Sequence, residues 1–81
     1  MTTRADGSLL VAGWMPADEL ADHLRLQLES SRDYETVAGL VLDRMGRLPE
    51  VGDSACIGPW RIEVMDMDGR RIDKLLVARI D

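Results

Sequence analysis

The 81-residue chain lacks phenylalanine altogether and contains one cysteine, one histidine, two tryptophans and one tyrosine. A single cysteine excludes an internal disulfide and favours a reducing compartment. No apolar run approaches the roughly 20 residues that a membrane-spanning helix needs, and the N-terminal residues lack the apolar segment of a signal peptide. We therefore expect no direct membrane insertion by this segment.

Basic residues are outnumbered. The chain has 10 Lys and Arg against 15 Asp and Glu, which gives a formal net charge of -5. Recognition of a phosphate backbone relies on clustered Lys and Arg. The sequence therefore predicts that nucleic acid is not a partner.

The remaining composition is typical of one globular domain. Hydrophobic residues make up 46% of the chain and charged residues 31%, which is too apolar for a disordered segment. We expect residues 1–81 to form a single domain whose core is filled by Leu, Val, Ile and Met. Because neither end carries a polar tail, we also expect this domain to be part of a longer protein.

Two Asp-Gly pairs divide the extended parts of the chain. Asp6-Gly7 and Asp68-Gly69 predict two-residue hairpin turns, since both residues tolerate positive φ. Further strands are expected at 54–57 and 60–65, where apolar and polar residues alternate. The last strand does not alternate cleanly, and we expect an irregularity near Asp73-Lys74.

Two segments between the hairpins have helical spacing. The first begins with Pro16 at its first position and ends near Leu24. The second follows Thr36, and its broad apolar arc predicts a helix buried on most of its circumference. The arc consists of Val37, Ala38, Leu40, Val41, Leu42, Arg44, Met45 and Leu48. Gly39 and Gly46 would let another backbone approach closely, or Gly46 would end the helix in a left-handed cap.

The order is thus strand, strand, helix, helix and three strands. Hairpin-connected strands around a helix pair favour an α+β two-layer sandwich, in which two helices cover a mostly antiparallel sheet.

The candidates for chemistry have simpler structural explanations. His23 has no second ligand at metal-binding spacing and is expected on the surface. Cys56 has no histidine nearby and is expected to be a packed or partly exposed thiol. Asp66–Gly69 has part of a calcium-loop pattern but lacks its remaining ligands, so a hairpin is favoured. Loop and turn positions, not nucleophilic roles, are expected for Ser30, Ser31 and Ser54. We predict no catalytic residue, no metal site and no cofactor.

Aromatic and basic residues offer better candidates for contact with a partner. Trp14 lies between a strand and a helix, where core packing and an exposed contact are equally supported. Core packing is favoured for Trp60. Arg70 and Arg71 could contact an anionic group, although nearby aspartates favour a charged hairpin tip.

Five stretches, in order, carry a family pattern: 6–13, 15–20, 33–42, 46–53 and 67–72. Together they resemble the transporter-associated domain of the CorC/HlyC family over nearly the whole chain. The most specific part is Thr-Val-Ala-Gly followed by Gly-x-x-Pro-x-x-Gly-Asp. The signature residues are Thr36, Val37, Ala38, Gly39, Gly46, Pro49, Gly52, Asp53, Asp68 and Gly69.

The resemblance implies a cytoplasmic domain of a membrane-associated protein that also carries CBS domains, described as a magnesium and cobalt efflux protein or as hemolysin-like. It implies a fold similar to part of FAD-binding (PCMH-like) domains. A non-catalytic regulatory domain that contacts the CBS domains and membrane segment of its own full-length chain is the favoured hypothesis. A sensor of an adenine nucleotide or flavin is the alternative, an enzyme is the least favoured class, and a homodimer is left open.

Overall fold

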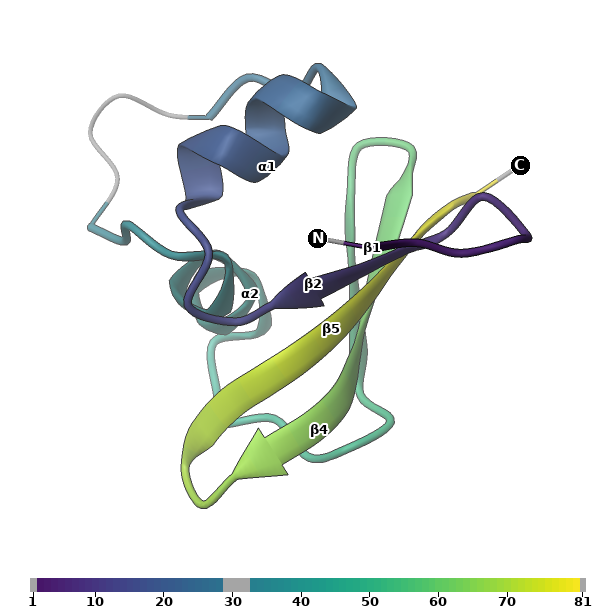
Figure 1. Cartoon of the computed structure of the whole chain (residues 1–81). Coiled ribbons are helices and arrows are strands. Elements are labelled where there is room, and N and C mark those ends of the chain that lie inside the picture. Colours follow the sequence, from purple (N-terminus) through teal and green to yellow (C-terminus); the bar gives the residue numbers. More distant parts are fainter. Residues whose placement is uncertain (1, 29–32, 81) are drawn as a thin grey trace.

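The computed structural model describes residues 2–28 and 33–80. The strands and helices found there follow the predicted order, with both helices on one side of the sheet (Figure 1). Their bounds are β1 (Thr2–Thr3), β2 (Leu9–Ala12), α1 (Ala17–Leu24), α2 (Val37–Met45), β3 (Ser54–Ile57), β4 (Trp60–Asp68) and β5 (Arg71–Arg79). Ser54 begins a strand, whereas Ser30 and Ser31 lie outside the described residues.

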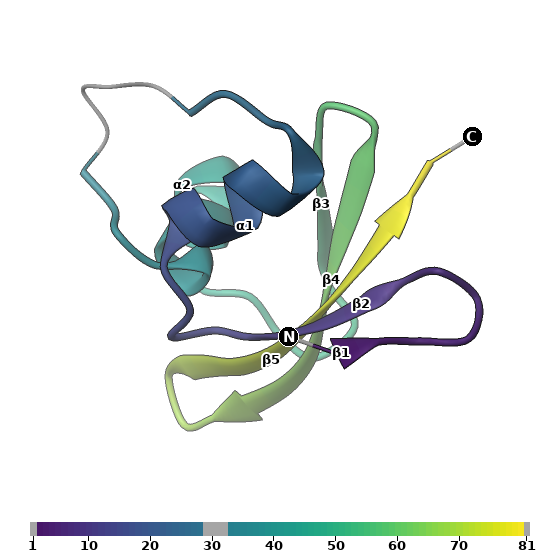
Figure 2. The same cartoon turned by 45° about the horizontal axis from the view of Figure 1, so that its top comes forward.

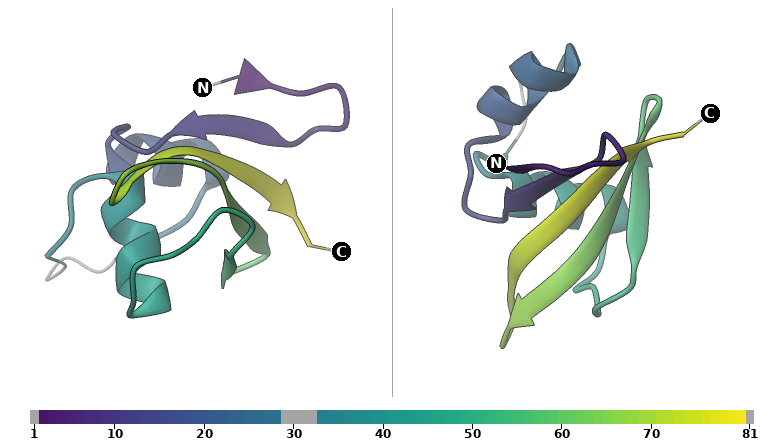
Figure 3. Two further views of the ribbon diagram at one scale, coloured as in Figure 1. Left: turned by 90° about the horizontal axis from the view of Figure 1, so that it is seen from below. Right: turned by 45° about the vertical axis from the view of Figure 1, so that its right-hand side comes forward.

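The sheet has the strand order β1-β2-β5-β4-β3, and every neighbouring pair is antiparallel. It twists strongly, with β5 and β4 running through its centre (Figure 2). In the view from below and in the view turned by 45°, the helices form a second layer against one face (Figure 3). The α+β two-layer prediction is confirmed, while the likeness to FAD-binding domains stays a prediction.

Aliphatic side chains fill the space between the two layers. The fully buried ones among them come from β2, α1, α2, β4 and β5. They are Val11, Leu20, Val37, Leu40, Val41, Ile62, Val64, Leu75 and Val77. Trp60 is half-buried against this core, as predicted, and the Arg79 guanidinium lies 5.8 Å from its ring centroid.

The irregularity predicted in the last strand is present. Val64 pairs with Leu75 and Met67 pairs with Ile72, so the register shifts between these pairs. Without the shift, Ile72 and Leu75 would point to opposite faces of the sheet. With it, Ile72, Leu75 and Val77 all face the core.

The first hairpin is wider than predicted. Thr3 and Leu9 are its innermost paired residues, so the connection is five residues long, not two. The Asp6 carboxylate accepts hydrogen bonds from the Ser8 amide at 3.0 Å and the Ser8 hydroxyl at 2.6 Å. These bonds stabilise the wider loop, in which Gly7 has a φ of 87°.

The second hairpin is displaced by one residue. Asp68 pairs with Arg71, so the central residues are Gly69 and Arg70, not Asp68 and Gly69. Gly69 has a φ of 63° and occupies the first central position, where a type II′ turn favours glycine. The turn therefore places both hairpin arginines at or beside the tip.

The helix ends follow their caps. Pro16 is the N-cap of α1 and not its first residue as predicted, so the helix begins one residue later, at Ala17. The Thr36 hydroxyl caps α2 by accepting a hydrogen bond from the Gly39 amide at 3.1 Å. Gly46 ends α2 in the left-handed conformation with a φ of 70°. No helix within residues 2–28 and 33–80 is both long enough and apolar enough to cross a bilayer.

The buried side of α2 is narrower than its apolar arc suggested. Leu42 and Leu48 are exposed, so the prediction of burial on most of the circumference is wrong. The helix packs only on the sheet side and against α1, and it ends at Met45 before Leu48. Gly39 does allow close packing, since a Cβ atom there would lie 2.8 Å from the Tyr34 Cβ.

Candidate interaction surface

An open groove lies between the exposed side of α2 and the β4–β5 hairpin. We call it the Trp14 groove, and it is lined by Gly13, Trp14, Thr36, Ala38, Gly39, Leu42, Arg70, Arg71 and Ile72. It brings together the three predicted contact residues and three signature residues, namely the α2 N-cap Thr36 and, within α2, Ala38 and Gly39. The other signature residues lie in α2, in the loop after it or at the β4–β5 turn.

Trp14 is the most exposed of the large hydrophobic residues in the described chain, at 76%. It occupies the turn between β2 and α1, and its neighbour Met15 is buried. The Met15 amide donates to the Ala12 carbonyl at 3.1 Å, and the Gly13 amide donates to the Asp73 carbonyl at 2.9 Å. The turn is thus fixed on both sides of Trp14, and the exposure of its side chain excludes core packing.

Arg70 and Arg71 form the basic part of the groove. Both side chains are exposed, and within the described residues neither has an ion pair. Asp68 is the cross-strand neighbour of Arg71. Because both side chains are exposed and neither forms an ion pair with a described residue, the two guanidiniums remain available to an anionic group on a partner.

Backbone amides, by contrast, are already bonded at the α2 N-terminus. The Val37 amide donates to the Met15 carbonyl at 2.8 Å, and the Ala38 amide donates to the Gly13 carbonyl at 2.9 Å. The Gly39 amide donates to the Thr36 hydroxyl. A helix N-terminus binds phosphate through free amides. Because the three amides named here are already bonded, they are not available to a phosphate group.

Sequence reasoning missed Gly13. Its φ is not left-handed, yet a Cβ atom here would overlap the Ile72 carbonyl oxygen and lie 2.9 Å from the Ile72 carbonyl carbon. The Gly13 backbone therefore passes directly between β5 and α2. The sequence signals were its place directly after an apolar strand and at the end of the family stretch 6–13.

A second hollow continues from the groove across α2. It shares Thr36, Gly39 and Leu42 with the Trp14 groove. Its remaining lining residues are Asp33, Tyr34, Glu35 and Asp43. The exposed side of α2 thus separates a basic hollow from an acidic one.

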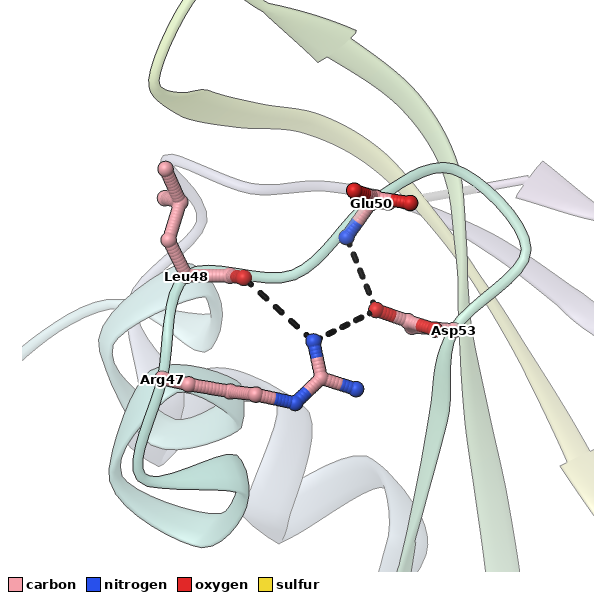
Figure 4. A network of polar contacts seen from close by, with 4 residues as sticks. All are labelled: Arg47, Leu48, Glu50 and Asp53. Carbon is pink, nitrogen blue, oxygen red and sulfur yellow. Dashed lines mark hydrogen bonds and ion pairs between the residues drawn. The ribbon is translucent and has the colours of Figure 1, made fainter.

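The loop from Arg47 to Asp53 joins α2 to the sheet (Figure 4). The Arg47 guanidinium and the Glu50 amide each donate to the same Asp53 carboxylate oxygen at 2.9 Å. The Gly52 amide donates to the Val64 carbonyl at 2.8 Å, and Gly52 has a φ of 97°. This part of the signature is therefore a structural clamp and does not line the Trp14 groove.

Comparison with known proteins decides the family. The chain matches the transporter-associated domain, CorC_HlyC, over residues 2–81. It belongs to the transporter-associated domain family. The family is named for its association with transporters and not for a catalytic reaction.

Relatives show both the fold and the larger setting of the domain. The domain is 39% identical to the UPF0053 protein sll0260 of Synechocystis, covering 95% of this chain, and 34% identical to a polyamine export protein of Escherichia coli K12, covering all of it. It spans 18% of the length of either relative. A solved transporter-associated domain from a Xylella fastidiosa hemolysin, in complex with Mg²⁺ and Mn²⁺, is 43% identical, with a TM-score of 0.90 over 100% of this chain and 98% of that one.

The remaining chemical candidates lie elsewhere in the transporter-associated domain. His23 is exposed in the last turn of α1, as predicted. Cys56 lies in β3 as predicted, with its thiol exposed. Asp66 and Asp68 belong to β4 at the start of the hairpin. In the part of the chain that the structure describes, no three His, Cys, Asp or Glu side chains are grouped as metal ligands.

The Asp53 clamp predicts a pH effect on stability. The Arg47 side chain and then the Glu50 amide hold the pKa of the Asp53 carboxyl below its usual range. Such a carboxylate stabilises the fold above its unfolded pKa, and the contribution is lost as the pH falls through the folded pKa. We expect the thermal midpoint to fall below about pH 4, and to fall less in Asp53→Asn, in melts followed by circular dichroism.

Arg47→Gln provides the graded control, since it removes the main cause of the lowered pKa and leaves the Glu50 amide in place. Its loss of stability with acid should lie between those of the wild type and Asp53→Asn. The Ser8 hydrogen bonds also lower the pKa of Asp6, and this contribution is common to all three proteins. Identical acid profiles for the three would contradict a stabilising role of the clamp.

Proposed function

We propose that this domain is a non-catalytic regulatory and interaction domain that modulates transport by a larger membrane protein. The family assignment and the small share of each curated relative that it spans support this setting. The observation that carries the proposal is the Trp14 groove, where a highly exposed tryptophan lies beside two arginines that form no ion pair with any described residue. Large exposed aromatics and arginines are the residues that most often anchor protein contacts.

The proposed cargo is a cation. Magnesium and cobalt efflux is what the CorC/HlyC resemblance implies, one relative is named a polyamine export protein, and one solved relative holds Mg²⁺ and Mn²⁺. We propose that the domain acts on the cytoplasmic side through the CBS domains and membrane segment of its full-length chain. The cargo itself is assigned to the membrane segment and not to the groove.

A sensor of adenine nucleotides or flavins is less well supported. Binding of such ligands at a helix N-terminus needs free backbone amides for phosphate. At α2 the amides of Val37, Ala38 and Gly39 are all bonded within the protein. The groove therefore favours contact with protein side chains.

The proposal is tested by Trp14→Ala in the full-length transporter that carries this domain. We expect the substitution to change the rate of cation flux in proteoliposomes, because it removes the largest exposed contact side chain of the groove. Flux should be measured with Mg²⁺, Co²⁺ and a polyamine in turn.

The matched control is Val51→Ala, since Val51 is also strongly exposed, at 61%, but does not line the groove. It should leave the flux unchanged. Equal flux in the wild type and Trp14→Ala for every cation would reject regulation through this surface.

A further inference from the structure

Charge is divided between the two ends of the surface on α2. In the described lining of the Trp14 groove there are two basic residues, Arg70 and Arg71, and no carboxylate. Among the described residues that line it, the hollow across α2 holds Asp33, Glu35 and Asp43 and no basic residue. A partner that covers the whole surface must therefore present an acidic end and a basic end.

Apolar side chains lie between these charged ends. Leu42 belongs to both hollows and is 36% exposed, and Trp14 is exposed beside it in the groove. The arrangement has the form of a protein interface, with an apolar centre and a polar rim. The order of basic end, apolar centre and acidic end is complementary to its own reverse, which is what a two-fold axis perpendicular to the surface requires.

We propose that a second copy of this domain docks on the surface, with a two-fold axis passing near Leu42. In such an isologous pair, if residue i of the first copy contacts residue j of the second, then residue j of the first copy contacts residue i of the second. Arg70 and Arg71 of each copy then face Glu35 and Asp43 of the other copy, and the Trp14 side chains lie toward the centre. The inference rests on the proposed function and assigns this surface to a second copy, not to the CBS domains or membrane segment of the same chain.

Charge complementarity favours a second copy over other occupants. A purely acidic partner would pair with the arginines and repel the three carboxylates at the other end, and a purely basic partner would do the reverse. Asp68 beside Arg71 reduces the positive charge of the basic end but does not cancel two arginines.

The test uses two charge-reversed proteins. One carries Arg70→Glu and Arg71→Glu, and the other carries Glu35→Lys and Asp43→Lys. All four side chains are exposed, and circular dichroism checks that each protein is folded. The chain can be studied by itself, because it covers 98% of a solved chain that is 43% identical to it.

Sedimentation equilibrium is measured for each protein alone and for an equal mixture, at roughly 10 µM to 1 mM, the range in which weak association is detected. The wild type should reach twice its mass of 9.0 kDa. Each reversed protein alone should remain monomeric because like charges then face each other. The mixture should form a dimer again, since the reversed basic end of one protein meets the reversed acidic end of the other.

Two further variants separate this geometry from a general charge effect. Arg4→Glu with Arg61→Glu makes the same charge change outside both hollows and should leave dimerisation intact. Trp14→Ala should weaken it by at least about tenfold. A monomeric wild type at the highest concentration, or a mixture that stays monomeric, would overturn the proposed dimer.

The flux measurement keeps the two proposals apart. A monomeric domain whose Trp14→Ala variant still changes transport would leave the regulatory function standing with another partner. A restored dimer in the mixture with unchanged transport would support the dimer and reject the regulatory function.

Discussion

Gly13→Ala is expected to be strongly destabilising, although it adds only one methyl group. The new Cβ atom would overlap the Ile72 carbonyl oxygen, which is backbone and cannot move away by a rotamer change. The Gly13 amide and carbonyl also bond to Asp73 and Ala38, so a shift of this residue disturbs both β5 and the start of α2. We expect a loss of about 3 kcal/mol or more in the free energy of unfolding, at the upper end for overpacking, measured by urea denaturation.

Gly46→Ala is the control for this prediction. Gly46 has a φ of 70°, and a Cβ atom there would meet nothing within 4 Å. The substitution therefore tests backbone conformation alone, at a cost of about 1–2 kcal/mol. If Gly13→Ala proved no worse than Gly46→Ala, the close passage between β5 and α2 would be wrong, and the Trp14 turn would not be held as described.

The contrast between these glycines shows where sequence reasoning stops. A helix end at Gly46 was one of the two roles left open by the sequence, because glycine favours a left-handed cap and Pro49 prevents continuation. Gly13 is needed because Ile72, 59 positions later in the chain (72 minus 13), lies against it in the fold. No local pattern records such a long-range contact.

The same limit applies to the candidate surface. Trp14, Arg70 and Arg71 were each noticed in the sequence as candidates for contact, but nothing placed them together. They meet because β2 pairs with β5 and because the turn after β2 is bonded to Asp73. The acidic hollow was not predicted. Glu35 and Asp43 lie together in it only because this side of α2 stays exposed, which the sequence did not indicate.

Periodicity was most reliable where local and long-range preferences agree. The faulty alternation of the last strand correctly predicted an irregularity, because buried Ile72, Leu75 and Val77 require one. The arc of α2 was misleading, because apolar composition does not tell how many sides of a helix are covered. Leu42 is part of that arc and yet remains exposed between the two hollows.

Leu75→Ala and Leu76→Ala should differ sharply, although the two leucines are neighbours in β5. Leu75 follows the register shift, faces the helices and is fully buried, whereas Leu76 points to the opposite face and is half-buried. Truncating a buried leucine removes its transfer free energy and leaves a cavity, at a cost of about 2–5 kcal/mol. For a domain of this size that corresponds to a fall in thermal midpoint of roughly 10 °C or more.

Leu76→Ala leaves no closed cavity, because its cross-strand neighbours Leu10 and Glu63 lie on the outer face, away from the helices. We expect it to cost about 1 kcal/mol, the centre of the distribution for point substitutions. The comparison tests the register directly, since a slip of one residue would exchange the two positions. A larger loss for Leu76→Ala than for Leu75→Ala would mean that β5 presents its other face to the core, and that Arg71 and the groove it lines are placed on the wrong side of the sheet.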